Sequence, residues 1–344
     1  MKNLNQLLRR NILELEGYKS GRELYSIDKT KILLDANENP HIHTLNRYPD
    51  PLQREVKAAI SPMKRIAENQ IFLANGSDES IDVIYRCFCN PGKDNVVAIE
   101  PSYARYKAGA LINEVEYRPV LLDEDFQVSC HRLLAKTDSR TKIIWLCSPN
   151  NPTGNSINRE EVLQTIKQFQ GIVVVDEAYS EFSVVPSLRA DIDKYPNLII
   201  LNTFSIAWGC ASVNLGAAYA SPEIIAIMNK VKYPYNVNEI TQREILKVLK
   251  DTSEVTKSVN NILEERSRVM EAVAMLPYTV KVFPSDANFF LVRFKNGPAV
   301  YEYLKKQGIM VRNRHDIPLC SNCIRITIGT SSENTALISA LRKL

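Results

Sequence analysis

Four short polar segments of the chain combine glycine, hydroxyl, amide and carboxylate groups, which are typical of sites that bind phosphates and amines. Each segment directly follows a hydrophobic run of strand length. The segments are residues 75–79, 148–154, 175–179 and 203–209. Ligands of open α/β sheets collect at the carboxyl ends of the strands. We therefore expect these four segments to form one ligand site.

The first segment contains Gly76, Ser77 and Asp78 and leads into a helical pattern. The free N–H groups at a helix N-terminus, together with the helix dipole, suit a phosphate. Ser77 or Asp78 could equally be an ordinary helix cap, and taken alone that interpretation is favoured. The segment is a candidate phosphate site only in combination with the others.

Asn151 and Asp176 belong to the second and third segments. Asn151 could present its amide to a ligand oxygen, although residues 148–154 are also compatible with a plain turn. Asp176 ends a hydrophobic run, where a carboxylate is costly unless a cation or hydrogen-bond donors pair with it. A protonated heteroaromatic nitrogen is such a cation.

The elements that must position these segments alternate between strand-like and helical patterns. Helical spacing occurs in residues 78–89 and 159–169. Residues 172–175 and 198–201 are apolar at consecutive positions, which is typical of strands covered on both faces. The strand-like runs are residues 71–74, 95–99, 142–147, 172–176, 198–202 and 216–220. The alternation predicts an α/β fold with a mostly parallel sheet.

The pattern changes after about residue 250. Apolar residues recur at helical spacing over residues 255–276 and predict a long helix that Pro277 ends. A pair of strands within residues 280–294 and 310–330, with a helix between them, and a terminal helix after Ser331 should follow. This part reads as a smaller α+β domain.

Composition excludes several classes of protein. The 344 residues are 45% hydrophobic and 24% charged, with a net charge of +4 and no long basic run, which argues against a nucleic-acid partner. The apolar stretches are far too short to cross a membrane. The first residues lack the apolar core of a signal peptide, so we expect a cytoplasmic protein with free thiols.

Two cysteine pairs raise the alternative of a metal site. Cys87 and Cys89, together with Cys320 and Cys323, could supply four thiolates to zinc. The two pairs lie far apart and no histidine spacing supports them. We interpret the cysteines as small buried hydrophobes and expect no bound metal.

In their order and spacing, the four segments resemble the fold-type I aminotransferases that depend on pyridoxal 5'-phosphate, and most of all the histidinol-phosphate aminotransferase family. The resemblance covers nearly the whole chain, because residues 35–40, 46–50, 285–289 and 324–329 match as well. It implies a seven-stranded sheet in a large domain, residues 49–248. An N-terminal segment, residues 1–48, and a small C-terminal domain, residues 249–344, complete the expected division.

The resemblance also assigns roles to individual residues. Ten positions would surround the cofactor, with the phosphate, the ring nitrogen, the ring face and the phenolic oxygen each contacted. They are Gly76, Ser77, Asp78, Ser205, Asn214 and the partner subunit's Tyr48 at the phosphate, Asp176 at the nitrogen, Tyr103 on the ring face, and Asn151 and Tyr179 at the phenolic oxygen. The family is homodimeric with shared active sites.

Three further residues would bind the substrates, an amino-acid phosphate and a 2-oxo acid of histidine biosynthesis. Arg325 matches the arginine that binds the substrate α-carboxylate, a bidentate task suited to guanidinium. Tyr18 falls near the substrate's own phosphate. Asn37 belongs to the same substrate side.

Two positions depart from the family pattern. Ile206 stands at the Schiff-base lysine and Asn214 at the arginine that neutralises the cofactor phosphate. Isoleucine has no side-chain nitrogen, and removing one member of a catalytic unit can cost about a millionfold in turnover. Asparagine carries no charge, and breaking a buried charge pair typically costs roughly 2–5 kcal/mol of binding. Lys230 and Lys232 are near in sequence but poor substitutes.

These departures leave several functional hypotheses. The first is a transaminase scaffold without normal activity, which binds pyridoxal phosphate weakly and non-covalently or not at all. The second is a non-catalytic protein that binds or senses an amino-acid phosphate. The others are an enzyme of altered chemistry and another fold-type I aminotransferase relative.

Overall fold

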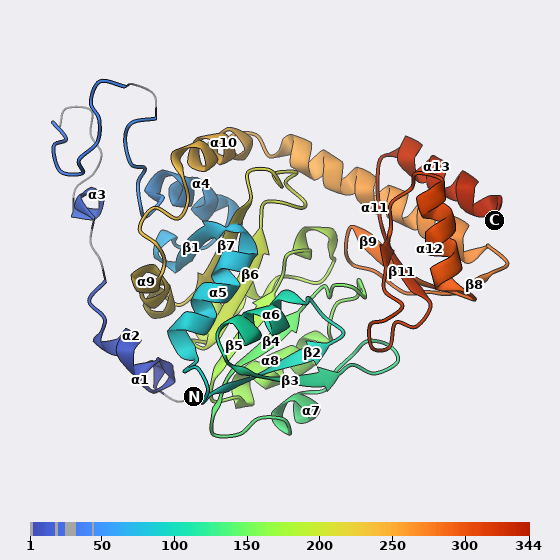
Figure 1. The fold of residues 1–344 in the computed structure, drawn as a ribbon, viewed down its shortest axis with the longest axis horizontal. Helices are drawn as coiled ribbons and strands as arrows, with labels where there is room; N and C mark the ends of the chain where they lie inside the picture. The colour runs from blue at the N-terminus through green and yellow to red at the C-terminus, as the bar shows by residue number, and fades with distance from the viewer. Residues whose placement is uncertain (1–2, 18–19, 25–31, 43–44) are drawn as a thin grey trace.

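The computed structural model describes residues 3–17, 20–24, 32–42 and 45–344. Two sheets lie side by side, and the long helix α11 reaches from the side of the larger sheet, next to α10, across to the smaller one (Figure 1). The strands are β1 Ile71–Asn75, β2 Asn95–Glu100, β3 Glu116–Leu121, β4 Thr141–Cys147, β5 Ile172–Asp176, β6 Leu198–Thr203, β7 Leu215–Ala220, β8 Thr279–Val282, β9 Phe289–Phe294, β10 Arg312–Asn313 and β11 Cys323–Thr327. The helices are α1 Leu4–Leu7, α2 Arg10–Glu14, α3 Gly21–Leu24, α4 Arg54–Lys64, α5 Gly76–Phe88, α6 Arg105–Ile112, α7 Cys130–Leu134, α8 Arg159–Gln168, α9 Pro222–Val231, α10 Glu239–Leu249, α11 Ser253–Ala274, α12 Gly297–Lys306 and α13 Ser331–Arg342.

The larger sheet has seven strands in the order β1-β7-β6-β5-β4-β2-β3. β2, β3, β4, β5 and β6 pair in parallel, whereas β7 runs antiparallel to both β6 and β1. The expected α/β fold with a mostly parallel seven-stranded sheet is confirmed.

Helices cover both faces of this sheet, which explains the consecutive apolar positions. In β5, Val173 and Val175 pack on one face with residues of α4, α7, α8 and α10. Ile172 and Val174 pack on the opposite face with residues of α1, α5, α6 and α9. Successive side chains of a strand point to opposite faces, so a strand buried on both must be apolar throughout.

The parallel strands end at one edge of the sheet, and each polar segment begins there. β1, β4, β5 and β6 lead directly into residues 76–79, 148–154, 177–179 and 204–209. Because β7 is antiparallel, its beginning lies at the same edge, which places Asn214 there, one residue before Leu215. This topology brings together segments that are up to about 130 residues apart in the sequence.

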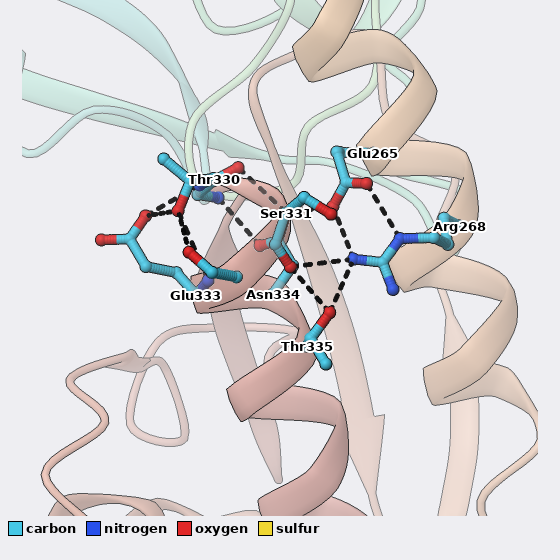
Figure 2. A network of polar contacts seen from close by, with 9 residues as sticks. Glu265, Arg268, Thr330, Ser331, Glu333, Asn334 and Thr335 are labelled. Atoms are coloured by element: carbon cyan, nitrogen blue, oxygen red, sulfur yellow. Dashed lines mark hydrogen bonds and ion pairs between the residues drawn. The ribbon is translucent and has the colours of Figure 1, made fainter.

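The second sheet has four strands in the order β10-β11-β9-β8 and packs against α11, α12 and α13. A polar network joins α11 to the start of α13 (Figure 2). Glu265 accepts hydrogen bonds from Arg268, at 2.6 Å from Nη2, and from the amide of Asn334 at 2.7 Å. Asn334 in turn accepts from the N–H of Gly329 at 2.9 Å, so the network holds the end of β11, the strand that carries Arg325.

Two expected elements differ in detail, and one strand, β3, is not among the predicted runs. The long helix α11 already ends at Ala274, before Pro277, where the Met275 N–H bonds back to the last turn. The C-terminal strand pair is a four-stranded sheet, because the segment between β8 and β9 turns and β10 pairs with β11. β3 lies at the sheet edge, largely exposed, so it has no apolar run to mark it.

The structure also shows the state of the cysteines, the grouping of possible metal ligands and the character of the helices. All seven cysteines are buried and free. Within the described ranges, no cluster of three or more histidine, cysteine or acidic side chains is arranged to hold a metal, and no helix is long and apolar enough to cross a bilayer.

The network in Figure 2 makes the stability of the smaller sheet depend on pH. The Arg268 guanidinium and the Asn334 amide lower the pKa of Glu265 to about 2. A carboxyl group whose pKa is lowered in the folded state stabilises the fold at any pH above its ordinary pKa of 4.5. This stabilisation is lost as the pH falls from 4.5 toward 2. Glu265→Gln should therefore reduce the unfolding free energy by about 1 kcal/mol at pH 7. Denaturant unfolding followed from pH 7 to pH 2 should show the difference vanish at the acid end.

The matched control is Glu264→Gln, one residue earlier on the exposed side of α11. This control should follow the unmodified chain throughout. An equal loss in both variants, or a loss independent of pH, would contradict the assignment to the network.

Candidate cofactor and substrate site

A cavity of about 230 Å³ lies at the carboxyl edge of the large sheet. Nine of the expected cofactor residues line it, together with Ile206. The full lining is Asn75, Gly76, Ser77, Asp78, Tyr103, Cys147, Asn151, Asp176, Ala178, Tyr179, Thr203, Ser205, Ile206 and Asn214. Residues from five strand ends and from the start of β7 therefore meet in one hollow.

Asp176 forms the floor of the cavity and is 2% exposed. One carboxylate oxygen accepts a hydrogen bond from the Tyr106 hydroxyl at 2.8 Å, and the other accepts from the Ala178 N–H at 3.1 Å. Burial raises the pKa of Asp176 to about 6, although both donors act in the opposite direction. Tyr106, which stacks on Trp145 in the core, is a site residue that the sequence did not mark.

A chain of polar side chains links the two sheets at the cavity wall. The Asn151 amide donates to the Tyr179 hydroxyl at 3.0 Å, and its oxygen accepts from Arg325 Nη1 at 2.7 Å. The Arg325 Nε is buried and has no hydrogen-bond acceptor among the described residues. Arg325 thus presents an unused donor beside the cavity.

The glycine turn at the start of α5 packs tightly against β7. Gly76 has φ +69°, and its N–H donates to the Asn214 carbonyl. A Cβ at Gly216 would lie 2.2 Å from the Gly76 carbonyl carbon, so this close approach requires glycine. The N–H groups of Ser77 and Asp78, in the first helical turn, have no acceptor within the helix and remain available to a ligand.

Asp78 lies at the same end of the cavity and has two partners of its own. Its carboxylate accepts from the Tyr103 hydroxyl at 3.0 Å and lies 3.5 Å from Arg105 Nε. Arg105 is not part of the lining. The described lining therefore contains no basic side chain.

Ile206 lies in the wall of the cavity and also packs against the core. Its neighbours Phe204 and Trp208 are buried, and the Lys64 ammonium lies 5.2 Å from the Trp208 ring centroid. Neither nearby lysine belongs to the cavity lining. Lys232 donates to the Pro51 carbonyl at 2.8 Å and to three further oxygens, outside the cavity. The Lys230 side chain packs near Gly17.

Three predicted residues are not brought to this cavity. Tyr48, half-exposed, stacks on Tyr235 with ring centroids 4.5 Å apart. Asn37 and Tyr48 line a separate open hollow near the start of α10. Tyr18 lies outside the described residues.

A second hollow of about 500 Å³ lies on the smaller sheet. Arg312 and Arg325, which are paired positions of β10 and β11, contribute two guanidinium groups to it. Arg325 therefore lies between this hollow and the Asn151 side of the cofactor cavity.

The fold and this cavity define the class of the protein as an aminotransferase of fold type I. The sequence model of aminotransferase class I and II matches residues 25–341. The chain is 52% identical over 343 residues to the histidinol-phosphate aminotransferase of Bacteroides fragilis strain YCH46, covering 100% of this chain and 99% of that relative. The chain belongs to the histidinol-phosphate aminotransferase family.

Solved structures agree with this assignment. The histidinol-phosphate aminotransferase of Clostridium acetobutylicum superposes with a TM-score of 0.80 at 27% identity, covering 87% of this chain and 90% of that one. The enzyme of Sinorhizobium meliloti, solved in complex with pyridoxal-5'-phosphate, shares the fold with a TM-score of 0.79 at 23% identity, covering 86% of this chain and 82% of that one.

The raised pKa of Asp176 predicts a pH-dependent effect of Asp176→Asn on the ligand-free protein. A carboxyl pKa raised from 3.8 to about 6 means that stability falls as the pH rises through this window. The amide variant avoids the ionised buried group, and its NH₂ can still donate to the Tyr106 oxygen. We expect the variant to be about 1–3 kcal/mol more stable than the unmodified chain at pH 8. Thermal unfolding should show little difference at pH 4.

Asp125→Asn is the control, because Asp125 is a largely exposed surface carboxylate. This variant should unfold at the same temperature as the unmodified chain at both pH 4 and pH 8. At each pH, the stability of the Asp176→Asn variant is compared with that of the unmodified chain. If the advantage of the variant is smaller at pH 8 than at pH 4, the desolvation argument is refuted.

Proposed function

We propose that the chain is a histidinol-phosphate aminotransferase scaffold that lacks normal transaminase activity. Ile206 carries the proposal, because it lies in the cavity wall at the position where the family pattern has its lysine. Transamination requires a protein amine that bonds the cofactor aldehyde and later moves a proton. An isoleucine side chain offers neither, and the described lining supplies no other amine.

The lining fits pyridoxal phosphate only in part. Asp176 would pair with a protonated ring nitrogen, Tyr103 would lie against the ring, and Asn151 with Tyr179 would contact the phenolic oxygen. The bound cofactor supplies an electron-withdrawing ring. The hydroxyls of Ser77 and Ser205 could reach the phosphate, but the described lining has no cation for it and no amine for the aldehyde. We therefore infer weak, non-covalent binding at most.

Restoring the two missing side chains tests the proposal directly. The unmodified chain should show no transamination of histidinol phosphate with 2-oxoglutarate, and borohydride should fix no cofactor onto it. Ile206→Lys should give measurable turnover, several orders of magnitude above the parent, because the loss of such a group costs about a millionfold. The double variant with Asn214→Arg should be more active still, and it should retain the cofactor through gel filtration.

Val184→Lys is the matched control, since it adds a lysine at a position that is 91% exposed. It should remain inactive. Turnover or borohydride-stable cofactor in the unmodified chain would refute the proposed inactivity.

A second candidate function is the binding of an amino-acid phosphate without catalysis, possible for a sensor or regulator. The buried Arg325 Nε, which lacks an acceptor among the described residues, favours it. Arg312 adds a second guanidinium on the neighbouring strand. The protein would then still bind the phosphate ester although it lacks the lysine that bonds the cofactor.

Calorimetry without added cofactor tests this second function. Histidinol phosphate should bind saturably, and histidinol without its phosphate should bind more weakly. Histidinol phosphate has no carboxylate, so the Arg325 guanidinium would pair with its phosphate, and Arg325→Met should weaken binding of the ester roughly 30-fold or more. The affinity of Arg325→Lys for histidinol phosphate should lie between those of the unmodified chain and Arg325→Met, because an ammonium group keeps the charge but lacks the bidentate geometry. Arg293→Met, on the same sheet but outside both hollows, should have no effect. Absence of saturation by histidinol phosphate would exclude this function.

We further propose a cytoplasmic homodimer in which the N-terminal segment, residues 1–48, completes the partner's site. Several apolar side chains of this segment and of α10 are exposed in the single chain, as expected of a surface that another copy covers. They are Leu34 at 88%, Leu45 at 62%, Tyr48 at 48% and Ile240 at 52% exposure. We also propose that the rest of the chain divides into a large domain, residues 49–248, and a small domain, residues 249–344.

A further inference from the structure

The charge of the cofactor cavity is the opposite of what a phosphate ligand needs. Its described lining contains two carboxylates, Asp78 and Asp176, and no lysine, arginine or histidine. Two guanidinium groups outside the lining are each paired with a lining residue: Arg105 lies 3.5 Å from Asp78, and Arg325 donates to Asn151. An anion that enters the cavity therefore meets two acidic side chains and no exposed cation from this lining.

The floor of the cavity still suits a cation. Each oxygen of Asp176 accepts one hydrogen bond from the protein, so each retains a lone pair for a ligand. A buried carboxylate gains most from a charged donor that it can bond directly. Tyr103 and Tyr179 line the same space, and aromatic rings attract flat cations.

The other end of the cavity retains only weak attraction for a phosphate. The N-terminus of α5, a helix of 13 residues, favours an anion by roughly two- to fivefold. An arginine paired with a buried anion typically contributes roughly 30-fold or more. Asn214 provides an amide at this position, and its Oδ1 lies against Gly76, 2.7 Å from where a Cβ would be. The helix terminus alone is therefore too weak to offset the missing charge.

We propose that this cavity selects a protonated nitrogen heteroaromatic without a phosphate group, which is held by Asp176 and the two tyrosine rings. The inference rests on the proposed function, because a covalent bond to the protein would retain a phosphorylated cofactor whatever its charge. With Ile206 in the wall, non-covalent contacts alone decide the ligand. Those contacts favour a cationic ring and penalise a dianionic tail.

The sharpest probe is the pair pyridoxine and pyridoxine 5'-phosphate, measured by calorimetry on the full chain. The two differ only in the phosphate, and neither has an aldehyde that could react with surface lysines. Pyridoxine should bind at least as tightly as its phosphate ester to the unmodified chain. Asn214→Arg should shift the ratio of the two dissociation constants at least tenfold toward the ester.

Asn214→Gln is the control for the backbone, because Asn214 has φ +53° and any longer side chain there meets the same strain. Without a charge it should leave the ratio unchanged. Asp176→Asn should weaken pyridoxine at least tenfold. Tighter binding of the ester by the unmodified chain, saturation by neither ligand, or an equal shift in the glutamine variant would each overturn the inference.

These outcomes are separate from those that bear on the proposed inactivity. Failure of the proposed function would appear as turnover or as borohydride-fixed cofactor in the unmodified chain. Failure of the ligand preference would appear in the reversible binding of pyridoxine and its phosphate ester, without any turnover or borohydride-fixed cofactor.

Discussion

Burial of the central strands on both faces is the constraint on which the site depends. β5 is covered by helices on either side, so its side chains are apolar until it ends at Asp176. Polar residues can enter only where the strands end, and the parallel direction places those ends at one edge. The carboxylate at the end of β5 is therefore desolvated by the same packing that stabilises the sheet. Its two hydrogen-bond donors, from Tyr106 and Ala178, reduce that cost only in part.

The two positions that depart from the family pattern are well accommodated by the fold. Ile206 packs against the core beside Phe204 and Trp208, and an apolar side chain there avoids the cost of a buried amine. Asn214 has φ +53°, a conformation that asparagine adopts more readily than most residues. Both side chains therefore fit the fold without strain or unpaired buried charge. Stability and activity are separable in this scaffold because functional groups at the strand ends are not the groups that form its core.

The contact between the two sheets keeps the substrate side of the site organised. Arg325 reaches from β11 to Asn151, and the Asp286 N–H donates to the Gly154 carbonyl at 2.7 Å. The network of Glu265 and Asn334 fixes the end of β11 from behind (Figure 2). The Arg325 guanidinium is therefore held in place by contacts on both sides, from Asn151 in the large sheet and from the network at the end of β11.

The sequence alone determined the α/β pattern and the four polar segments, because strand burial and strand-end loops are local properties of residue type. It also determined that Ile206 has no amine, since that is a matter of composition. Other features needed the tertiary structure. The partnership of Tyr106 with Asp176 joins positions 70 residues apart, and that of Arg325 with Asn151 joins positions 174 apart. The exposed edge strand β3 has no periodic signal. The charge of the cavity was likewise decided in three dimensions, because only folding determines which charged side chains face the same space.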